Sequence, residues 1–238
     1  MTDAPPSNLV LAALPEVDRR RVEADLTSVD LVRSTVLAEV GEPLRSVTFP
    51  AGGAVSLVTA TVDGGSVEAV LIGNEGLVGT WIAAGIEGAP WRTIVQAGGA
   101  GFQMSPQAFR AHVAAIPIFG TLVARYNIAA HLLTSQSAAC NRFHELSART
   151  ARWLLMVSDR TGSDEITLTQ EFLAQMLGAY RPSVTVALRF LGTAGIIAVG
   201  RSRITLLDRG GLLAFACKCY QVNLQQHATL LRIDDAVD

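Results

Sequence analysis

Between Thr169 and Leu191 the chain reads TQEFLAQMLGAYRPSVTVALRFL, and this stretch predicts two helices joined by a tight turn, a helix-turn-helix. The Thr169 hydroxyl is placed to cap the first helix. Gly178 falls in the turn, where the backbone needs a positive φ that a side chain would strain. Val184 follows Gly178 by six residues, a position from which it can fill the space between the helices.

The residues after this stretch predict a basic β-hairpin, because Gly200-Arg201-Ser202 is a turn signal directly before a short β-rich run that begins at Arg203. The combination indicates a winged helix, which we favour over an inert helical hairpin. In that geometry the second helix enters the major groove of DNA. Arg181 at its start is expected to make two hydrogen bonds to guanine. The arginines farther along, Arg189, Arg201 and Arg203, are expected to contact phosphates. The full set of predicted DNA-binding residues is Thr169, Gln170, Tyr180, Arg181, Ser183, Thr185, Arg189, Arg201 and Arg203.

Charge supports this interpretation, although the whole chain is slightly acidic. It has 19 basic and 21 acidic residues and a formal net charge of −2, which argues against a protein that coats nucleic acid. Between Met176 and Leu212, however, five arginines stand against one acid, Asp208, so this segment carries +4. Such a local excess is what a DNA-binding domain in an acidic chain would show, and an ordinary solvent-exposed face is the alternative explanation.

The N-terminal half has a different residue pattern. Residues 8–27 have apolar residues at helical intervals. From about Thr35 to Met104 the chain is rich in Val, Thr and Gly, with turn signals every 8 to 12 residues, which predicts a small antiparallel sandwich or barrel. Asp63-Gly64, between two β-rich runs, predicts a hairpin there.

After Ser105 the pattern becomes helical, with a long helix predicted over 116–140 and another over 143–159. Apolar residues follow a seven-residue rhythm along the first of these helices. The rhythm fits either a seam between two copies of the chain or packing on the chain's own β-rich region, and the two interpretations stay equally open. On the first interpretation, the dimer interface consists of Phe119, Leu122, Tyr126 and Leu133.

Several motifs resemble the Crp/Fnr family of bacterial transcription regulators. They are CNRFHE at 140–145, RWLLM at 152–156, Asp159-Arg160 and LTQEFLA at 168–174, with Phe49-Pro50, GAVSLV at 53–58 and GNEG at 73–76 in the N-terminal half. The resemblance covers nearly the whole chain. It implies an α+β protein with a β-roll sensor of the cyclic-nucleotide-binding type, a long dimerisation helix and a C-terminal winged helix. It also implies a homodimer on a near-palindromic operator.

We therefore expect a β-roll sensor domain at 8–115, a dimerisation helix at 116–140, a winged helix-turn-helix domain at 141–225 and a C-terminal tail at 226–238. The expected partners are double-stranded DNA and a second copy of the chain, with RNA polymerase left open. The alternative is an effector-sensing or protein-interaction module that does not bind DNA. Loss of DNA binding in a wing mutant would favour the regulator.

A departure from the family pattern affects the small effector. In the relatives that bind cyclic nucleotides, a Gly-Glu pair opens the phosphate cassette and an Arg-Ser or Arg-Thr pair closes it. Here Gly79-Thr80 stands at the first position and Arg92-Thr93 at the second. Because Thr80 replaces the glutamate that binds the ribose, cyclic AMP is not expected to bind well, and no cofactor is predicted. Arg92 is placed to hold a phosphate, but a surface arginine on a strand is the more common case.

Cysteine and histidine usage predicts no metal site and no enzyme. The only cysteines are Cys140, Cys217 and Cys219, too few for a four-cysteine iron–sulfur cluster. Cys217-Lys218-Cys219 offers half of a zinc site with only His227 nearby in sequence, so an ordinary reduced pair is favoured. The β-rich region contains no histidine, and no catalytic motif is present. With no secretory signal and no convincing membrane span, the expected location is the cytoplasm.

Overall fold

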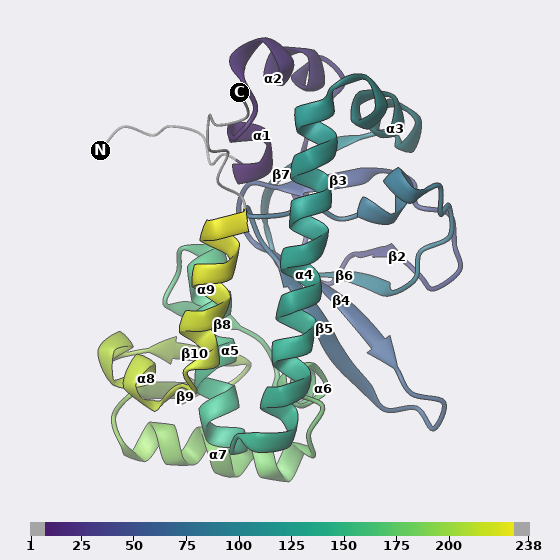
Figure 1. The fold of residues 1–238 in the computed structure, drawn as a ribbon. Coiled ribbons are helices and arrows are strands. Elements are labelled where there is room, and N and C mark those ends of the chain that lie inside the picture. Colours follow the sequence, from purple (N-terminus) through teal and green to yellow (C-terminus); the bar gives the residue numbers. More distant parts are fainter. Residues whose placement is uncertain (1–7, 231–238) are drawn as a thin grey trace.

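A computed structural model describes residues 8–230 of the chain (Figure 1). The first two helices are α1 (Leu9–Ala12) and α2 (Glu16–Glu23), which the sequence predicted as one helical region. Asn8 caps α1 by accepting hydrogen bonds from the backbone of Val10 and Leu11. Pro15 stands immediately before α2, and the segment therefore folds as two short helices rather than one.

The β-rich region forms two antiparallel sheets, as the sequence predicted. One sheet has the order β1-β7-β3 and the other has the order β2-β6-β4-β5. Their strands are β1 (Thr27–Leu31), β2 (Val36–Ala38), β3 (Val47–Pro50), β4 (Ala54–Ala60), β5 (Ser66–Ile72), β6 (Arg92–Ala97) and β7 (Gly99–Met104). The short 3₁₀ helix η1 (Thr80–Ala84) lies between β5 and β6. The predicted hairpin joins β4 to β5, and Gly64 in its loop has φ +90°.

A long helix runs past these sheets. Helix α3 (Pro106–Ala115) leads into α4 (Pro117–Phe143), which follows it at an angle of 111°. Pro117 enters the first turn of α4, as predicted. Among residues 8–230, no single helix has the length and apolar composition to cross a membrane, and α3 and α4 meet that criterion only as a bent pair.

The packing of α4 corrects the predicted dimer interface. Phe119, Leu122, Tyr126 and Leu133 are all buried within one copy of the chain, between 0% and 3% exposed. Phe119 packs on Phe49 and Phe109, with ring centroids 6.4 and 5.7 Å apart. These four side chains therefore cannot form a surface for a second copy. Both interpretations of the seven-residue rhythm were open from sequence, and the larger side chains serve packing on the sheets.

The C-terminal part follows α4 after a short link at 144–145. Its elements are α5 (Leu146–Thr161), β8 (Glu165–Thr167), α6 (Gln170–Leu177), α7 (Arg181–Thr193), β9 (Ile197–Gly200), β10 (Arg203–Leu206), α8 (Arg209–Phe215) and α9 (Cys219–Leu230). The three strands form one antiparallel sheet in the order β8-β10-β9. Helix α9 returns alongside α4 (Figure 1). The predicted tail at 226–238 begins inside α9, and residues 231–238 lie outside the described part of the chain.

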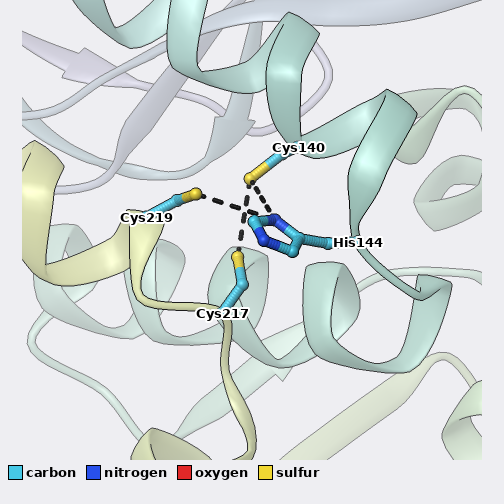
Figure 2. A group of neighbouring side chains, drawn as sticks. All are labelled: Cys140, His144, Cys217 and Cys219. Atoms are coloured by element: carbon cyan, nitrogen blue, oxygen red, sulfur yellow. Dashed lines mark hydrogen bonds between the residues drawn. The ribbon is translucent and has the colours of Figure 1, made fainter.

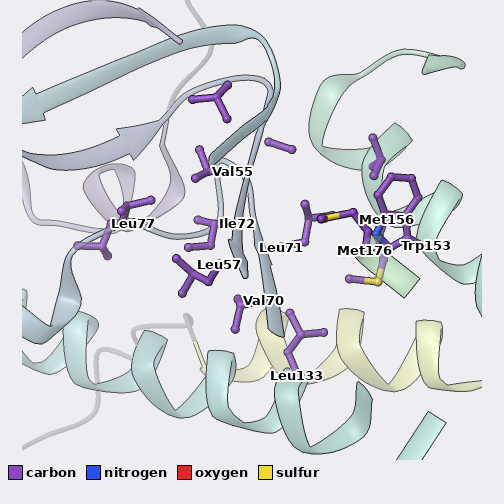
Figure 3. Close-up of a cluster of buried hydrophobic side chains, with 14 of the residues drawn as sticks. Val55, Leu57, Val70, Leu71, Ile72, Leu77, Leu133, Trp153, Met156 and Met176 are labelled. Carbon is purple, nitrogen blue, oxygen red and sulfur yellow. The ribbon is translucent and has the colours of Figure 1, made fainter. Parts of the chain in front are cut away.

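One apolar core joins the N-terminal sheets to the C-terminal part. Figure 3 shows two neighbouring residues of β5 that face different helices. Val70 lies near Leu133 of α4, and Leu71 faces Met176 of α6 and Trp153 of α5. Trp153 Nε1 also donates a hydrogen bond to Glu68 of β5 at 3.0 Å. The strand β5 is therefore the element that fixes the C-terminal helices against the sheets.

Candidate DNA-binding interface

The first helix of the predicted helix-turn-helix begins and ends where its sequence predicts. The backbone N–H of Phe172 donates to Thr169 Oγ1 at 3.1 Å, which is the expected cap of α6. Gly178 ends the helix with φ +57°. A Cβ at Gly178 would also lie 3.0 Å from Val67 Cγ2 of β5. The turn therefore needs glycine both for its backbone conformation and for the close approach of the β4–β5 hairpin.

The second helix, α7, presents one face to the core and another to solvent. Val184, Leu188 and Leu191 are at most 1% exposed and, with Leu173 of α6, belong to the apolar core. Pro182 falls in the first turn of α7, where backbone N–H groups have no helical acceptor. The sequence therefore placed both helices and their shared core correctly.

The solvent face of α7 brings most of the predicted DNA-binding residues together. Tyr180, Arg181, Ser183 and Arg189 are exposed, and Tyr180 is 83% exposed just before the helix begins. A second helix that is open at its N-terminal end and supported from behind has the geometry needed to enter a major groove.

Gln170 and Thr185 lie differently from the other predicted contacts. Both are half-buried, and Thr185 Oγ1 donates to Gln170 Oε1 at 2.7 Å. This hydrogen bond joins the start of α6 to the first turns of α7. The pair therefore helps to set the angle between the two helices at the side that faces solvent.

The predicted wing is a two-stranded hairpin of β9 and β10, with Arg203 paired to Gly200 across a turn at Arg201-Ser202. Ser202, the second residue of this turn, has φ +58°, in the left-handed region. Arg201 and Arg203 are both exposed on this hairpin. The wing therefore presents positive charge next to the exposed start of α6.

Two of these arginines have acidic partners on the surface. Arg181 lies 3.8 Å from Glu171 and Arg203 lies 3.4 Å from Glu165, with more than half of each side chain exposed. Exposed ion pairs of this kind contribute about 0–1 kcal/mol. A phosphate or a guanine can therefore replace the carboxylate at little cost.

The set of predicted DNA-binding residues omits Val186. Its side chain is 64% exposed on α7, at the helical position after Ser183 and before Arg189. An apolar side chain at this place suits the methyl group of thymine. The helical spacing of 183, 186 and 189 was a usable signal, but an apolar residue inside a helix is more often part of a core.

Of the four predicted effector residues, only Thr80 lines the cavity between the sheets and α4. This cavity measures about 270 Å³ and is walled mainly by apolar and aromatic side chains, including Trp81, Trp91 and Tyr126. Arg92 instead points outward and pairs with Glu39 at 3.1 Å. Gly79 is buried with φ +103° and Thr93 is fully buried in β6, and neither lines the cavity.

Comparison with known proteins also finds a helix-turn-helix domain in the C-terminal part, and solved structures with a similar fold. A family model described as the Crp-like helix-turn-helix domain matches residues 148–215. A CRP-family transcriptional regulator from Thermus thermophilus has a similar structure, with a TM-score of 0.65 and 22% identity over 79% of this chain and 96% of that chain. FixK2 from Bradyrhizobium japonicum has a TM-score of 0.65 and 16% identity over 81% of this chain and 98% of that one. A crp/fnr-family regulator from Eubacterium rectale has a TM-score of 0.63 and 14% identity over 87% and 96%. No curated protein matches the sequence.

Proposed function

Since this chain has the fold of the Crp/Fnr transcription regulators and carries a Crp-like helix-turn-helix DNA-binding domain, we propose that it binds a specific double-stranded DNA operator as a homodimer. It acts in the cytoplasm as a regulator and not as an enzyme, with RNA polymerase as the further partner. Helix α7 reads the bases, and the wing holds the DNA backbone.

The observation that carries this proposal is the division of α7 into two faces. Its inner face is buried against α5 and α6, while Arg181, Ser183, Val186 and Arg189 are left exposed. Arginine offers two donors to guanine and valine offers a methyl contact to thymine. An exposed face that combines base-reading residue types, beside a basic wing, supports sequence-specific binding.

The proposed homodimer uses the face of α4 that the sheets leave free. Exposed residues recur along it at alternating spacings of three and four, and they are Thr121, Ala124, Ile128, His131, Ser135, Ala138 and Arg142. This is the spacing of a two-helix seam. Ala124 and Ala138 are small enough for close approach of a second helix, and Ile128, 54% exposed, is the large apolar residue at its centre.

The test is selection of bound sequences from a pool of random double-stranded DNA, using the full chain. We expect an inverted repeat whose half-sites lie about 10–10.5 base pairs apart, or a multiple of this, because two copies related by a twofold axis present their α7 helices to successive major grooves. If no sequence is enriched over the starting pool, the proposal is wrong and the interaction-module alternative replaces it.

We also propose a small effector in the cavity between the sheets and α4. Apart from the exposed His131, no side chain among its walls is ionisable near neutral pH, since burial raises the pKa of Tyr126 further above its ordinary value. The indole N–H of Trp81 is buried and has no acceptor within residues 8–230. These features suit a neutral, largely apolar molecule with one hydrogen-bond acceptor and do not suit the phosphate of cyclic AMP.

Calorimetry with 2-naphthol and with cyclic AMP tests this effector class. We expect heat of binding for 2-naphthol, a weaker signal with the Trp81→Phe variant, and none for cyclic AMP. Micromolar affinity for cyclic AMP would refute the proposed class. Because His131 and Asn127 of α4 line the cavity next to the proposed dimer face, a bound effector would act on that face directly.

A further inference from the structure

Four potential metal ligands, far apart in sequence, meet where α4 ends (Figure 2). Cys140 lies in the last turn of α4 and His144 directly follows that helix, while Cys217 lies between α8 and α9 and Cys219 is the first residue of α9. Their ligand atoms all lie within 4.8 Å of one another. None of these four residues belongs to the proposed DNA-binding face or to the effector cavity.

We propose that Cys140, His144, Cys217 and Cys219 bind one zinc ion as a tetrahedral site with three sulfur ligands and one nitrogen ligand. The proposal is independent of DNA binding. Three thiolates and one imidazole are a known donor set for structural zinc, and soft sulfur ligands favour zinc over magnesium or calcium.

The distances between the donor atoms fit a single ion. Cys140 Sγ lies 3.5 Å from Cys217 Sγ, His144 Nδ1 lies 3.4 Å from Cys140 Sγ, and Cys219 Sγ lies 3.7 Å from His144 Nδ1. A tetrahedron built on zinc–sulfur bonds of about 2.3 Å has edges of about 3.8 Å. An iron–sulfur cluster places several iron and sulfide atoms between its ligands and would require wider separations.

The residues around the four ligands supply an outer hydrogen-bond donor and bury the three cysteines. Gln136 Nε2 lies 2.9 Å from Cys219 Sγ and donates to it, as outer donors do around zinc-bound thiolates. All three cysteines are buried, and His144 closes the group from the solvent side. The group therefore has four protein ligands and no open position, which indicates a structural site.

A buried positive charge beside the cluster provides an independent argument. Arg152 is only 7% exposed, and its Nε and Nη1 have no hydrogen-bond partner within residues 8–230. It lies close enough for its charge to act on Cys140 and Cys217. When Zn²⁺ binds, each of three thiols releases a proton to solvent, and the site carries one net negative charge. That charge stabilises the buried guanidinium of Arg152, in addition to the Glu68 carboxyl, which also lies close enough to interact with it.

The position of the proposed zinc site would let one ion join three segments of the chain. His144 belongs to the link between α4 and α5, so one ion would join the end of α4, this link and the start of α9. A zinc ion there would hold the C-terminal helix on α4 and fix the point where the helix-turn-helix part departs from α4.

The experiment uses the full chain, reduced and freed of metal by a chelator, and titrated with Co²⁺ and then with Zn²⁺. We expect one Co²⁺ per chain with the visible absorption of tetrahedral cobalt and the charge-transfer band of thiolate ligands, both abolished when Zn²⁺ displaces it. Cys217→Ser and His144→Ala should each lose the tetrahedral spectrum. Gln136→Leu, which keeps all four ligands, should lower zinc affinity about 10–100-fold.

Two control variants distinguish loss of a metal ligand from misfolding or from the loss of any histidine. His112→Ala removes a histidine of α3 that pairs with Asp25 and should leave zinc affinity unchanged. His144→Cys replaces the imidazole with a fourth thiol and should restore tetrahedral cobalt binding, which a variant that merely misfolds would not do. The proposal is overturned if cobalt binds with an octahedral spectrum or not at all, if His144→Ala binds as the wild type does, or if the purified chain contains iron with sulfide or a disulfide between Cys140 and Cys217.

Discussion

Glu75 and Arg160 form a buried ion pair between the N-terminal sheets and α5, with 2.6 Å between Glu75 Oε1 and Arg160 Nη2. Arg160 Nε donates to the same oxygen at 2.9 Å. The two side chains are only 13% and 9% exposed. Glu75 follows β5, so this pair reinforces the contact through which the sheets hold the C-terminal part.

Replacing Glu75 with alanine leaves the largely buried charge of Arg160 without its acidic partner, while the hydrogen bond from Nη1 to the Met156 carbonyl remains. Breaking a buried pair in this way costs about 3–5 kcal/mol. We expect the free energy of unfolding of Glu75→Ala to fall by about this amount in chemical denaturation. The control is Glu165→Ala, which removes the exposed partner of Arg203 and should cost less than about 1 kcal/mol. Equal losses in the two variants would contradict the role given to the buried pair.

The proposed dimer face predicts that Ile128→Glu changes the oligomeric state of the chain. A charge at the centre of the seam would be buried against a second copy, so the chain should become monomeric in sedimentation. Ile86→Glu is a matched control, because Ile86 is also about half exposed, at 49% against 54% for Ile128, but lies between η1 and β6 and not on α4. If Ile128→Glu remains dimeric, the seam lies elsewhere on the molecule.

The helix-turn-helix was predictable from sequence because its signals are local. The cap at Thr169, the turn at Gly178 and the buried Val184 lie within sixteen residues of one another, and each has its own physical requirement. The structure agrees at each of these three positions. The hairpin at Asp63-Gly64 and the wing at Arg201-Ser202 were predictable for the same reason.

The dimer face and the cysteine cluster depend on contacts that the sequence does not contain. Along α4 a seven-residue rhythm describes both faces, and only the packing of Phe119 on Phe49 shows which face the sheets cover. Cys217 and Cys219 looked like half of a site because Cys140 and His144 lie more than seventy residues away in the chain. Tertiary structure, not spacing, joins the two halves.

The acidity of Glu68 predicts a pH dependence of stability. Removal of its carboxyl from water raises the pKa of Glu68 above its ordinary value of 4.5, more than hydrogen bonds from Ser56 and Trp153 lower it. The folded chain therefore binds this proton more tightly than the unfolded chain does. The resulting stabilisation is complete below pH 4.5 and is lost as the pH rises through the raised pKa of the folded state.

Glu68→Gln, which stays neutral, isolates this effect. We expect the free energy of unfolding of the wild type, relative to that of Glu68→Gln, to decrease as the pH rises above 4.5. Denaturation of both proteins across this range measures the difference. A difference that is constant with pH, or that increases, would show that Glu68 is no harder to ionise in the folded chain.

Arg181 and Arg203 should affect DNA binding in different ways. Arg181 begins α7, where its guanidinium can meet the two acceptors of guanine. Arg181→Ala is therefore expected to cost about 1–3 kcal/mol on the selected operator and to relax the preference at one base pair in each half-site. Arg203 lies on the wing, which is proposed to contact phosphates, so Arg203→Ala should weaken all sequences alike and reduce the slope of log affinity against log salt by about one.

Titration of both variants against the operator and its single-base variants, at several salt concentrations, separates base reading from phosphate contact. Each variant serves as the control for the other, because each arginine has an exposed acidic partner of similar geometry, Glu171 or Glu165. If Arg181→Ala weakens every sequence equally, Arg181 contacts phosphate, and base reading passes to Ser183 and Val186 on the same exposed face of α7. If neither variant changes DNA binding, α7 is not the recognition helix, and the chain functions through protein contacts instead.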